Sequence, residues 1–85
     1  MGHSVEFKNA ARKSIAALPG DIKARVISAA MSLADNPRPS GCKKVRSLDS
    51  AYRIRVGDYR IIYEVYDVVL VVMVIRVAHR REVYE

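Results

Sequence analysis

The feature that most constrains the fold is a single change in the spacing of apolar residues, at the segment DNPRPSG (residues 35–41). Before this segment, apolar residues recur every three or four positions, which is typical of helices that bury one face. After it, they alternate or form continuous runs, which is typical of β-strands. The two prolines and the glycine of the segment stop a helix from continuing. The chain is therefore expected to fold from a helical part followed by a part made of strands.

Two helices are expected before residue 35, after a short strand in HSVEF (residues 3–7). The first helix lies in KNAARKSIAAL (residues 8–18) and is broken by Pro19 and Gly20. Asp21 favours the first turn of the second helix, where a carboxylate meets the positive end of the helix dipole. Each helix has one apolar stripe: Phe7, Ala11, Ile15 and Leu18 for the first, and Ile22, Val26, Ala29, Ala30 and Leu33 for the second.

Four strands are expected after Gly41, with a two-residue hairpin turn at Gly57–Asp58 and another turn in residues 66–69. The last strand falls in the apolar run from Val68 to Val77, which is rich in β-branched residues and is interpreted as a buried central strand. It is too short to cross a bilayer, which needs roughly 20 apolar residues. The strand segments are KKVRSL (43–48), YRIRV (52–56), YRIIYEV (59–65) and LVVMVIRV (70–77).

These elements predict an α+β fold: a short N-terminal strand, then a helical hairpin packed on one face of a small antiparallel β-sheet. The chain has 85 residues, which favours one domain over residues 1–85. It contains one cysteine, Cys42, so an intramolecular disulfide cannot form, and nothing in the composition indicates an exported, oxidised protein.

Three arginines stand in the predicted hairpin. If Gly57–Asp58 is the turn, Arg55 lies opposite Arg60, and Arg53 lies two residues along on the same face. Two interpretations remain open: the guanidinium groups are solvated or bind a carboxylate such as Glu64, or their counter-ion is a ligand phosphate. The formal net charge of +6 favours a polyanionic partner such as nucleic acid.

The C-terminal stretch RVAHRREVYE (residues 76–85) adds His79 and Tyr84, two side chains that are able to exchange a proton, beside two arginines. The alternative is an exposed basic tail. No set of His and Cys residues has the spacing of a metal site, and no Gly-rich phosphate loop is present. The sequence therefore predicts a site without metal or cofactor.

Three stretches together resemble the RelE/ParE superfamily of bacterial toxins from type II toxin–antitoxin systems, and more narrowly its RelE branch. They are LPGDIKARV (18–26), KVRSLDSAYRIRVGDYRIIYEV (44–65) and VIRVAHRREVYE (74–85). The resemblance implies a ribosome-dependent endoribonuclease, an mRNA interferase, that cuts mRNA in the ribosomal A site. It also implies the chemistry: the ribose 2′-hydroxyl attacks the adjacent phosphate and leaves a 2′,3′-cyclic phosphate, without a metal.

The resemblance assigns roles to the three hairpin arginines. Arg53 and Arg55 fall on a pair of basic positions that are often lysine in the family. Because arginine stays protonated, neither suits the role of general base. Arg60 falls on the position of the phosphate clamp, where a cation stabilises the negative charge that grows during the reaction.

The resemblance also assigns roles near the C-terminus. The catalytic C-terminal arginine falls on Arg80, with Arg81 as the alternative because this tail is shorter than in some members. Tyr84 falls on a terminal tyrosine that stacks on a base or exchanges a proton. His79 is the residue we expect to transfer the proton, with Tyr84 assisting. Expected RNA contacts are Lys43, Lys44, Arg46 and Arg81, with Lys8, Arg12, Lys13, Lys23 and Arg25 on the helices as candidates for rRNA phosphates.

The implied partners are a cognate antitoxin, the ribosome with its A-site rRNA, and mRNA, in the cytoplasm and without a membrane. Promoter DNA is expected to be bound only through the antitoxin complex. Two other functions remain open: a ParE-like poison of DNA gyrase, and a non-catalytic RNA- or ribosome-binding module.

Overall fold

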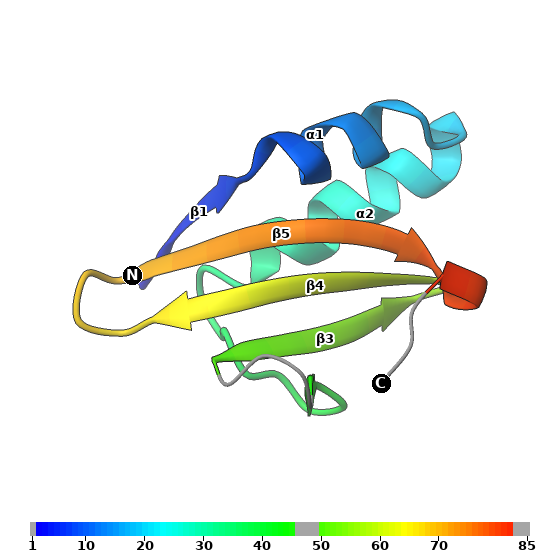
Figure 1. Cartoon of the computed structure of the whole chain (residues 1–85). Helices are drawn as coiled ribbons and strands as arrows, with labels where there is room; N and C mark the ends of the chain where they lie inside the picture. The colour runs from blue at the N-terminus through cyan, green and yellow to red at the C-terminus, as the bar shows by residue number, and fades with distance from the viewer. Residues whose placement is uncertain (1, 46–49, 83–85) are drawn as a thin grey trace.

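The structure of the chain is a computed structural model that describes residues 2–45 and 50–82, the side chain of residue 82 excepted. Within these residues, two α-helices cover one face of a five-stranded sheet (Figure 1). The α+β fold with a helical hairpin on one sheet face is therefore confirmed. None of the described helices has the length and apolarity that a bilayer crossing needs.

The chain begins with β1 (Ser4–Phe7), followed by α1 (Asn9–Ala16) and α2 (Gly20–Ser32). Pro19 caps α2 in an extended conformation, and Asp21 lies in its first turn, as the sequence predicts. The predicted stripes face the sheet: the fully buried helical residues include Ala11, Val26 and Ala30. Both helices are thus held mainly by one apolar face, as short amphipathic helices are.

The sheet has the strand order β1-β5-β4-β3-β2. Its other strands are β2 (Lys43–Lys44), β3 (Ala51–Val56), β4 (Tyr59–Tyr66) and β5 (Val71–His79), and a 3₁₀ turn η1 (Arg80–Glu82) follows. The strands β2 to β5 pair antiparallel, as expected, but β1 pairs parallel with β5. The sheet is therefore mixed, a detail that alternation within a four-residue strand does not reveal because the pattern carries no direction.

The predicted turn at Gly57–Asp58 is confirmed, with Val56 paired to Tyr59 across it. Gly57 has a φ of 59°, in the left-handed region that a glycine adopts without steric cost. Of the two turn residues, this first one has the positive φ, which is the pattern of a type II′ hairpin turn. The turn fixes the register of β3 against β4 and with it the positions of the arginines.

The interpretation of the whole run from Val68 to Val77 as a buried strand was wrong at its first three residues, whereas the turn expected in residues 66–69 is confirmed to within one residue. Val68, Val69 and Leu70 are 98%, 66% and 51% exposed, and they lie in the β4–β5 turn rather than in a buried strand. β5 begins at Val71, which pairs with Tyr66 of β4 and with Ser4 of β1. These two pairings set the strand start, and composition alone does not contain them.

One residue is inserted into β5 relative to β4. Ile62 pairs with Arg76, but the next residue of β4, Tyr63, pairs with Val74, so Ile75 is the extra residue of a β-bulge. Because side chains alternate between faces, a one-residue insertion reverses the faces of all later residues. The bulge therefore determines on which face of the sheet the His79 side chain lies.

The two faces of the sheet are covered differently. The main core lies between the sheet and the helices and includes Leu33, Ile61, Tyr63, Val72 and Val74. The opposite face has a smaller apolar cluster of Val45, Ala51 and Ile62, with Ile75 packed against it. We call this second face the open face, because no helix in the described residues covers it (Figure 1).

Candidate functional site

The hairpin arginines gather on the open face, as the sequence predicts. Arg55 is paired directly with Arg60 across the β3–β4 ladder, and Arg53 is paired with Ile62. Residues directly opposite each other share a face, with Cβ atoms about 5 Å apart, and like charges in such a pair repel. We call Arg53, Arg55 and Arg60 the arginine cluster.

Within the described residues, no hydrogen bond or ion pair joins Arg55 or Arg60 to a carboxylate. The predicted partner Glu64 instead accepts hydrogen bonds from Ser50, at 3.4 Å, and from the hydroxyl of Tyr66. Two guanidinium groups are thus placed opposite each other without a neutralising acid in the described part of the chain. Such an arrangement is suited to an anionic ligand.

A cavity of about 330 Å³ lies beside the cluster and is lined by Gly41, Lys43, Arg53 and Arg55. Lys43 reaches it because it pairs with Arg53 and therefore shares its face. The next residue, Lys44, pairs with Tyr52, whose side chain packs on the helix-side core. Of these two predicted RNA contacts, the structure brings Lys43 to the arginine cluster and places Lys44 on the other face.

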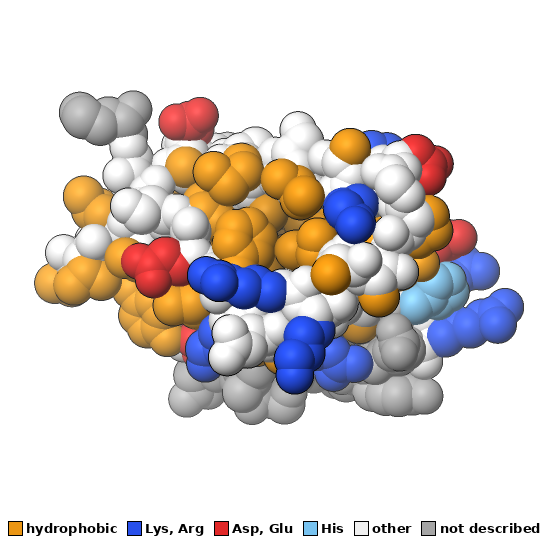
Figure 2. Space-filling model, turned by 90° about the horizontal axis from the view of Figure 1, so that it is seen from above, with side chains coloured by type: hydrophobic (Ala, Val, Ile, Leu, Met, Phe, Trp, Pro, Cys, Tyr) orange, Lys and Arg blue, Asp and Glu red, His pale blue; other side chains and the backbone are white. Residues whose placement is uncertain are grey.

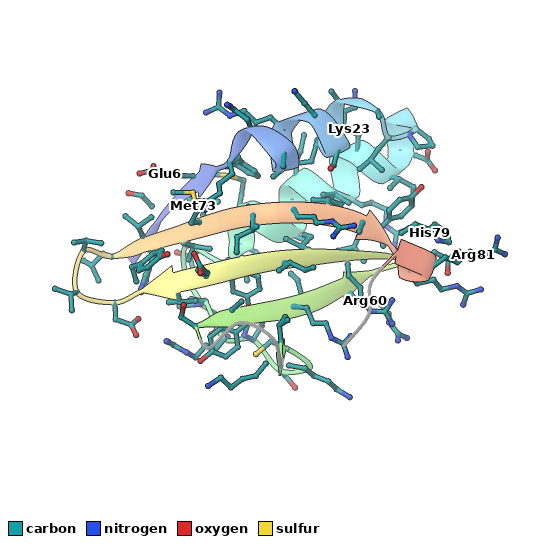
Figure 3. All side chains as sticks on the ribbon, in the orientation of Figure 1. Glu6, Lys23, Arg60, Met73, His79 and Arg81 are labelled. Atoms are coloured by element: carbon teal, nitrogen blue, oxygen red, sulfur yellow. The ribbon has the colours of Figure 1, made fainter. Side chains whose placement is uncertain are left out.

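Arg80 is tied to the β3–β4 turn. Its backbone N–H donates to the carbonyl of Asp58 at 2.7 Å, and its guanidinium lies 3.9 Å from the Asp58 carboxylate. This contact brings the end of β5 and the hairpin turn to the same end of the molecule, where Arg60 also lies (Figure 3). Arg81, one residue further, is exposed.

His79 lies on the opposite side of the sheet from the arginine cluster. It pairs with Tyr59, and the two rings meet edge to face with centroids 5.2 Å apart. Tyr59 packs against the helix-side core, whereas Arg60 projects from the other side of the same strand end (Figure 3). The bulge at Ile75 is the physical reason, since an uninterrupted strand would turn His79 to the open face.

The imidazole of His79 also has a defined neighbour on the backbone. The N–H of Arg81 donates to Nδ1 at 3.3 Å, which leaves Nε2 as the nitrogen that carries the proton in the neutral ring. The ring lines a cavity of about 260 Å³ together with Leu18 and Tyr59, next to the end of α1.

Two predicted site residues, Arg46 and Tyr84, lie outside the described residues. The helical candidates for rRNA contacts are spread over α1, α2 and the residue before α1. Among them, Arg25 reaches the β3–β4 turn, where it lines a cavity with Arg55 and Gly57. Helical spacing placed Arg25 on α2, but its proximity to the hairpin depends on how α2 packs on the sheet.

No group of three His, Cys, Asp or Glu side chains in the described residues is placed to hold a metal ion.

Cys42 is a half-buried free thiol beside Tyr63. Burial raises the pKa of the Tyr63 hydroxyl, and the neighbouring Cys42 raises this pKa further. That hydroxyl donates to the carbonyl of Pro37 at 2.8 Å. The Tyr63 hydroxyl thus helps to hold the loop after α2 against the sheet.

A second polar cluster, at the other end of β4, was not predicted. The guanidinium of Arg38 donates to the Asp67 carboxylate at 2.8 and 3.4 Å. It also donates to the Tyr52 hydroxyl at 3.1 Å and lies over the Tyr52 ring. The imidazole of His3 forms a hydrogen bond with the same carboxylate at 3.0 Å. Hydrogen bonds from Arg38 and then His3 hold the pKa of Asp67 below its usual value. We call these four residues the Asp67 network. No local pattern signals it, because its members come from four separate segments.

Comparisons with known proteins agree with this geometry. Residues 5–84 match the family model described as the ParE toxin of the type II toxin–antitoxin system parDE. The chain is 33% identical over 85 residues to Toxin RelG of Mycobacterium tuberculosis, covering 99% of this chain and 98% of that protein.

Solved structures give the same result. A chain of the toxin–antitoxin complex RelBE2 from Mycobacterium tuberculosis superposes with a TM-score of 0.83 at 32% identity, covering 94% of this chain and all of that one. A chain of the archaeal RelE–RelB complex from Pyrococcus horikoshii also has a TM-score of 0.83, at 25% identity, covering 98% of this chain and all of that one.

Proposed function

Since the chain belongs to the RelE/ParE superfamily of toxins from type II toxin–antitoxin systems, we propose that it is a ribosome-dependent endoribonuclease that cleaves mRNA in the ribosomal A site. The observation that carries the proposal is the Arg55–Arg60 pair on the open face, which has no carboxylate partner among the described residues. A phosphodiester bound between these two residues would accept hydrogen bonds from both guanidinium groups.

The proposed reaction needs no metal. The ribose 2′-oxygen forms a bond to the adjacent phosphorus, the bond from phosphorus to the 5′-oxygen breaks, and a 2′,3′-cyclic phosphate remains. A base takes the proton of the 2′-hydroxyl, and an acid donates one to the leaving 5′-oxygen. Arg55 and Arg60 would hold the phosphate and stabilise its growing negative charge, because arginine does not give up its proton.

We assign proton transfer to His79, with Tyr84 assisting, and phosphate contact to Arg53 and Arg80. For His79 to take part, the bound RNA has to pass over the end of β5, because the imidazole lies on the helix side and Arg60 on the open side. Replacing His79 with Ala should then lower the cleavage rate while RNA binding is kept. Full cleavage by this variant would remove His79 from the mechanism.

We further propose a cognate antitoxin as the partner of this toxin, in the cytoplasm, with promoter DNA bound through the antitoxin. An apolar groove of about 290 Å³ between α1 and α2 offers a docking surface and is lined by Phe7, Arg12, Ile15, Ala16, Ile27 and Met31. Figure 2 shows hydrophobic side chains gathered over this side of the molecule, with cationic side chains at their border. Ile27 and Met31 are 40% and 49% exposed, so an antitoxin helix would cover them with an apolar face. Acidic residues at the flanks of that helix would meet the cationic side chains at the border of the groove.

The second candidate function is poisoning of DNA gyrase. The observation in its favour is that the matching family model carries the ParE name. The third, a non-catalytic RNA- or ribosome-binding module, would use the same cationic surface without cleavage. The replacement of lysine by arginine at positions 53 and 55 is the feature in its favour.

One experiment separates the three functions. Primer extension on an mRNA in a purified translation system compares the wild-type chain, Arg60→Ala, and a reaction without ribosomes. We expect A-site cleavage that needs ribosomes and falls by about 10²–10³-fold in Arg60→Ala, as for the loss of one donor to a developing oxyanion. Growth arrest without cleavage would favour gyrase. Neither cleavage nor toxicity would leave a binding module.

A further inference from the structure

A second cationic cavity lies on the other side of β3 from the one beside the arginine cluster. It has a volume of about 570 Å³ and opens between α2 and the end of β3. We call it the α2–β3 groove. Its lining residues are Ala24, Arg25, Ser28, Ala29, Ser32, Arg55, Val56 and Gly57.

The guanidinium group of Arg25 lies next to the hairpin turn. Its two terminal guanidinium nitrogens lie 3.8 and 3.9 Å from the position that a Cβ atom on Gly57 would occupy. Like Arg55, Arg25 forms no hydrogen bond or ion pair within the described residues. The nearby acidic residue of the turn, Asp58, faces Arg80 instead. The groove therefore has two guanidinium groups whose charge is not neutralised in the described part of the chain.

Arg55 connects this groove to the open face. It lines both the 330 Å³ cavity beside Arg53 and the α2–β3 groove. Arg55 is able to line both cavities because it lies at the edge of the sheet. In the described residues, β2 pairs with β3 only at Tyr52 and Arg53, so no strand lies beside Arg55 on that side of β3. A long side chain on this edge reaches both sides of the sheet.

We propose that the α2–β3 groove binds a second phosphate of the same RNA strand, so that the strand passes from the arginine cluster around the edge of β3 to Arg25. The inference rests on the proposed RNA-cleaving function and extends it to a new contact. Arg25 would bind the phosphate, and the Ser28 hydroxyl lies in the same groove as a further donor. Phosphate contacts position a strand without reading its sequence, so the groove adds affinity and alignment.

An RNA strand fits the groove better than a protein segment does. The groove is continuous with the arginine cluster through Arg55, and it carries two guanidinium groups and two serines. The apolar groove between α1 and α2 has the opposite character, since its lining is dominated by Phe7, Ile15, Ile27 and Met31. The two grooves thus differ in the class of ligand that they would attract.

The test measures binding of a labelled short single-stranded RNA over a series of salt concentrations, by fluorescence anisotropy. Arg25→Gln should weaken binding and reduce the slope of log K against log salt by about 0.7, the value for one phosphate contact on a single strand. Arg38→Gln is the charge-matched control, because it removes the same charge from the Asp67 network at the other end of β4. Ser28→Glu, which adds a carboxylate to the groove and keeps Arg25, should weaken binding in the same direction.

Thermal unfolding followed by circular dichroism establishes that each variant is folded at the assay temperature. Equal slopes for Arg25→Gln and Arg38→Gln would overturn the proposal. The proposal would also be overturned if Arg25→Gln lost affinity for poly-glutamate but bound RNA as the wild-type chain does. The groove would then be a binding site for an acidic protein partner.

The ribosomal assay separates this proposal from the proposed function. Arg25→Gln should raise KM and leave kcat unchanged, as for a contact made equally in the ground and transition states. If the wild-type chain does not cleave at all but Arg25→Gln still lowers the salt slope, the groove stands and the endoribonuclease function fails. If the wild-type chain cleaves and Arg25→Gln has the wild-type KM and slope, the groove fails alone.

Discussion

The two ends of β4 hold arginines in opposite surroundings. At the Tyr66 end, Arg38 binds the Asp67 carboxylate through two nitrogens and lies over the Tyr52 ring. At the Tyr59 end, Arg55 faces Arg60 and neither has a carboxylate partner among the described residues. Figure 1 shows these ends on opposite sides of the molecule.

This difference separates structural from functional charge. The carboxylate of Asp67 satisfies Arg38 in the folded chain, so Arg38 contributes to the fold and has little capacity left for a ligand. The Arg55–Arg60 pair contributes repulsion to the fold, and a bound phosphate removes that repulsion. The same residue type thus serves stability at one end and binding at the other, depending on the nearest acid.

The largest expected effect comes from giving the functional end a carboxylate. Arg55→Glu places an acid directly opposite Arg60, which should lower the ribosome-dependent cleavage rate by at least about 10²-fold. The new cross-strand pair should also stabilise the fold by about 0.2–1 kcal/mol. Single-turnover cleavage and thermal unfolding measure the two effects, with Arg55→Gln as the control that removes charge without adding an acid. A variant that cleaves at the wild-type rate would contradict the role of this pair.

The next effect concerns the buried hydroxyl that fixes the loop carrying Arg38. Tyr63 is fully buried and its hydroxyl donates to the Pro37 carbonyl. Tyr63→Phe should destabilise the fold by about 1 kcal/mol, because the carbonyl loses its donor. For a chain of this size the melting temperature should fall by roughly 4–8 °C. Tyr66→Phe, which removes an exposed hydroxyl from the same strand, is the matched control, and an equal decrease in both variants would contradict the prediction.

A smaller effect is expected for Arg38→Gln. The guanidinium is partly exposed, and exposed ion pairs contribute little, so the melting temperature should decrease by less than in Tyr63→Phe. Added salt should reduce the difference from the wild-type chain, because salt screens the pair. Cleavage below the melting transition should be unchanged. A cleavage defect comparable to that of Arg55→Glu would mean that both ends of β4 serve the reaction.

The smallest effect is a dependence of stability on pH. Because the pKa of Asp67 is lowered in the folded chain, its carboxylate stabilises the fold above the unfolded value of about 3.9. This contribution is lost as the pH falls through the lowered folded pKa. The difference in melting temperature between the wild-type chain and Asp67→Asn should therefore be present at neutral pH and disappear in acid. A difference that is unchanged down to low pH would assign the effect of Asp67→Asn to something other than its charge.

Much of the fold follows from local patterns. Apolar spacing predicts both helices, Pro19 marks the break between them, and Gly57 marks the hairpin turn, all of which the structure confirms. These features depend on residues close together in the sequence, so a pattern is able to reveal them. The parallel pairing of β1 with β5 and the start of β5 at Val71 depend on distant segments, and local patterns do not contain them.

The site was predictable to the extent that it lies in one hairpin. Arg55 and Arg60 are opposite each other because two turn residues fix their register, and alternation adds Arg53. Lys43 and Arg25 come to the same region from other segments, through the pairing of β2 and the packing of α2. The Asp67 network, whose members again come from separate segments, could not be predicted for the same reason.

By itself, the sequence determined the helical hairpin, the β3–β4 hairpin and the pair of facing arginines, because each is set by turn chemistry and alternation over a few residues. Only the tertiary structure decided which face His79 meets, through the extra residue Ile75 in β5. Only the tertiary structure paired Arg38 with Asp67 and left Arg55 without a carboxylate among the described residues. Charges interact over a few ångströms in space, and the chain brings distant acids near an arginine only after it has folded.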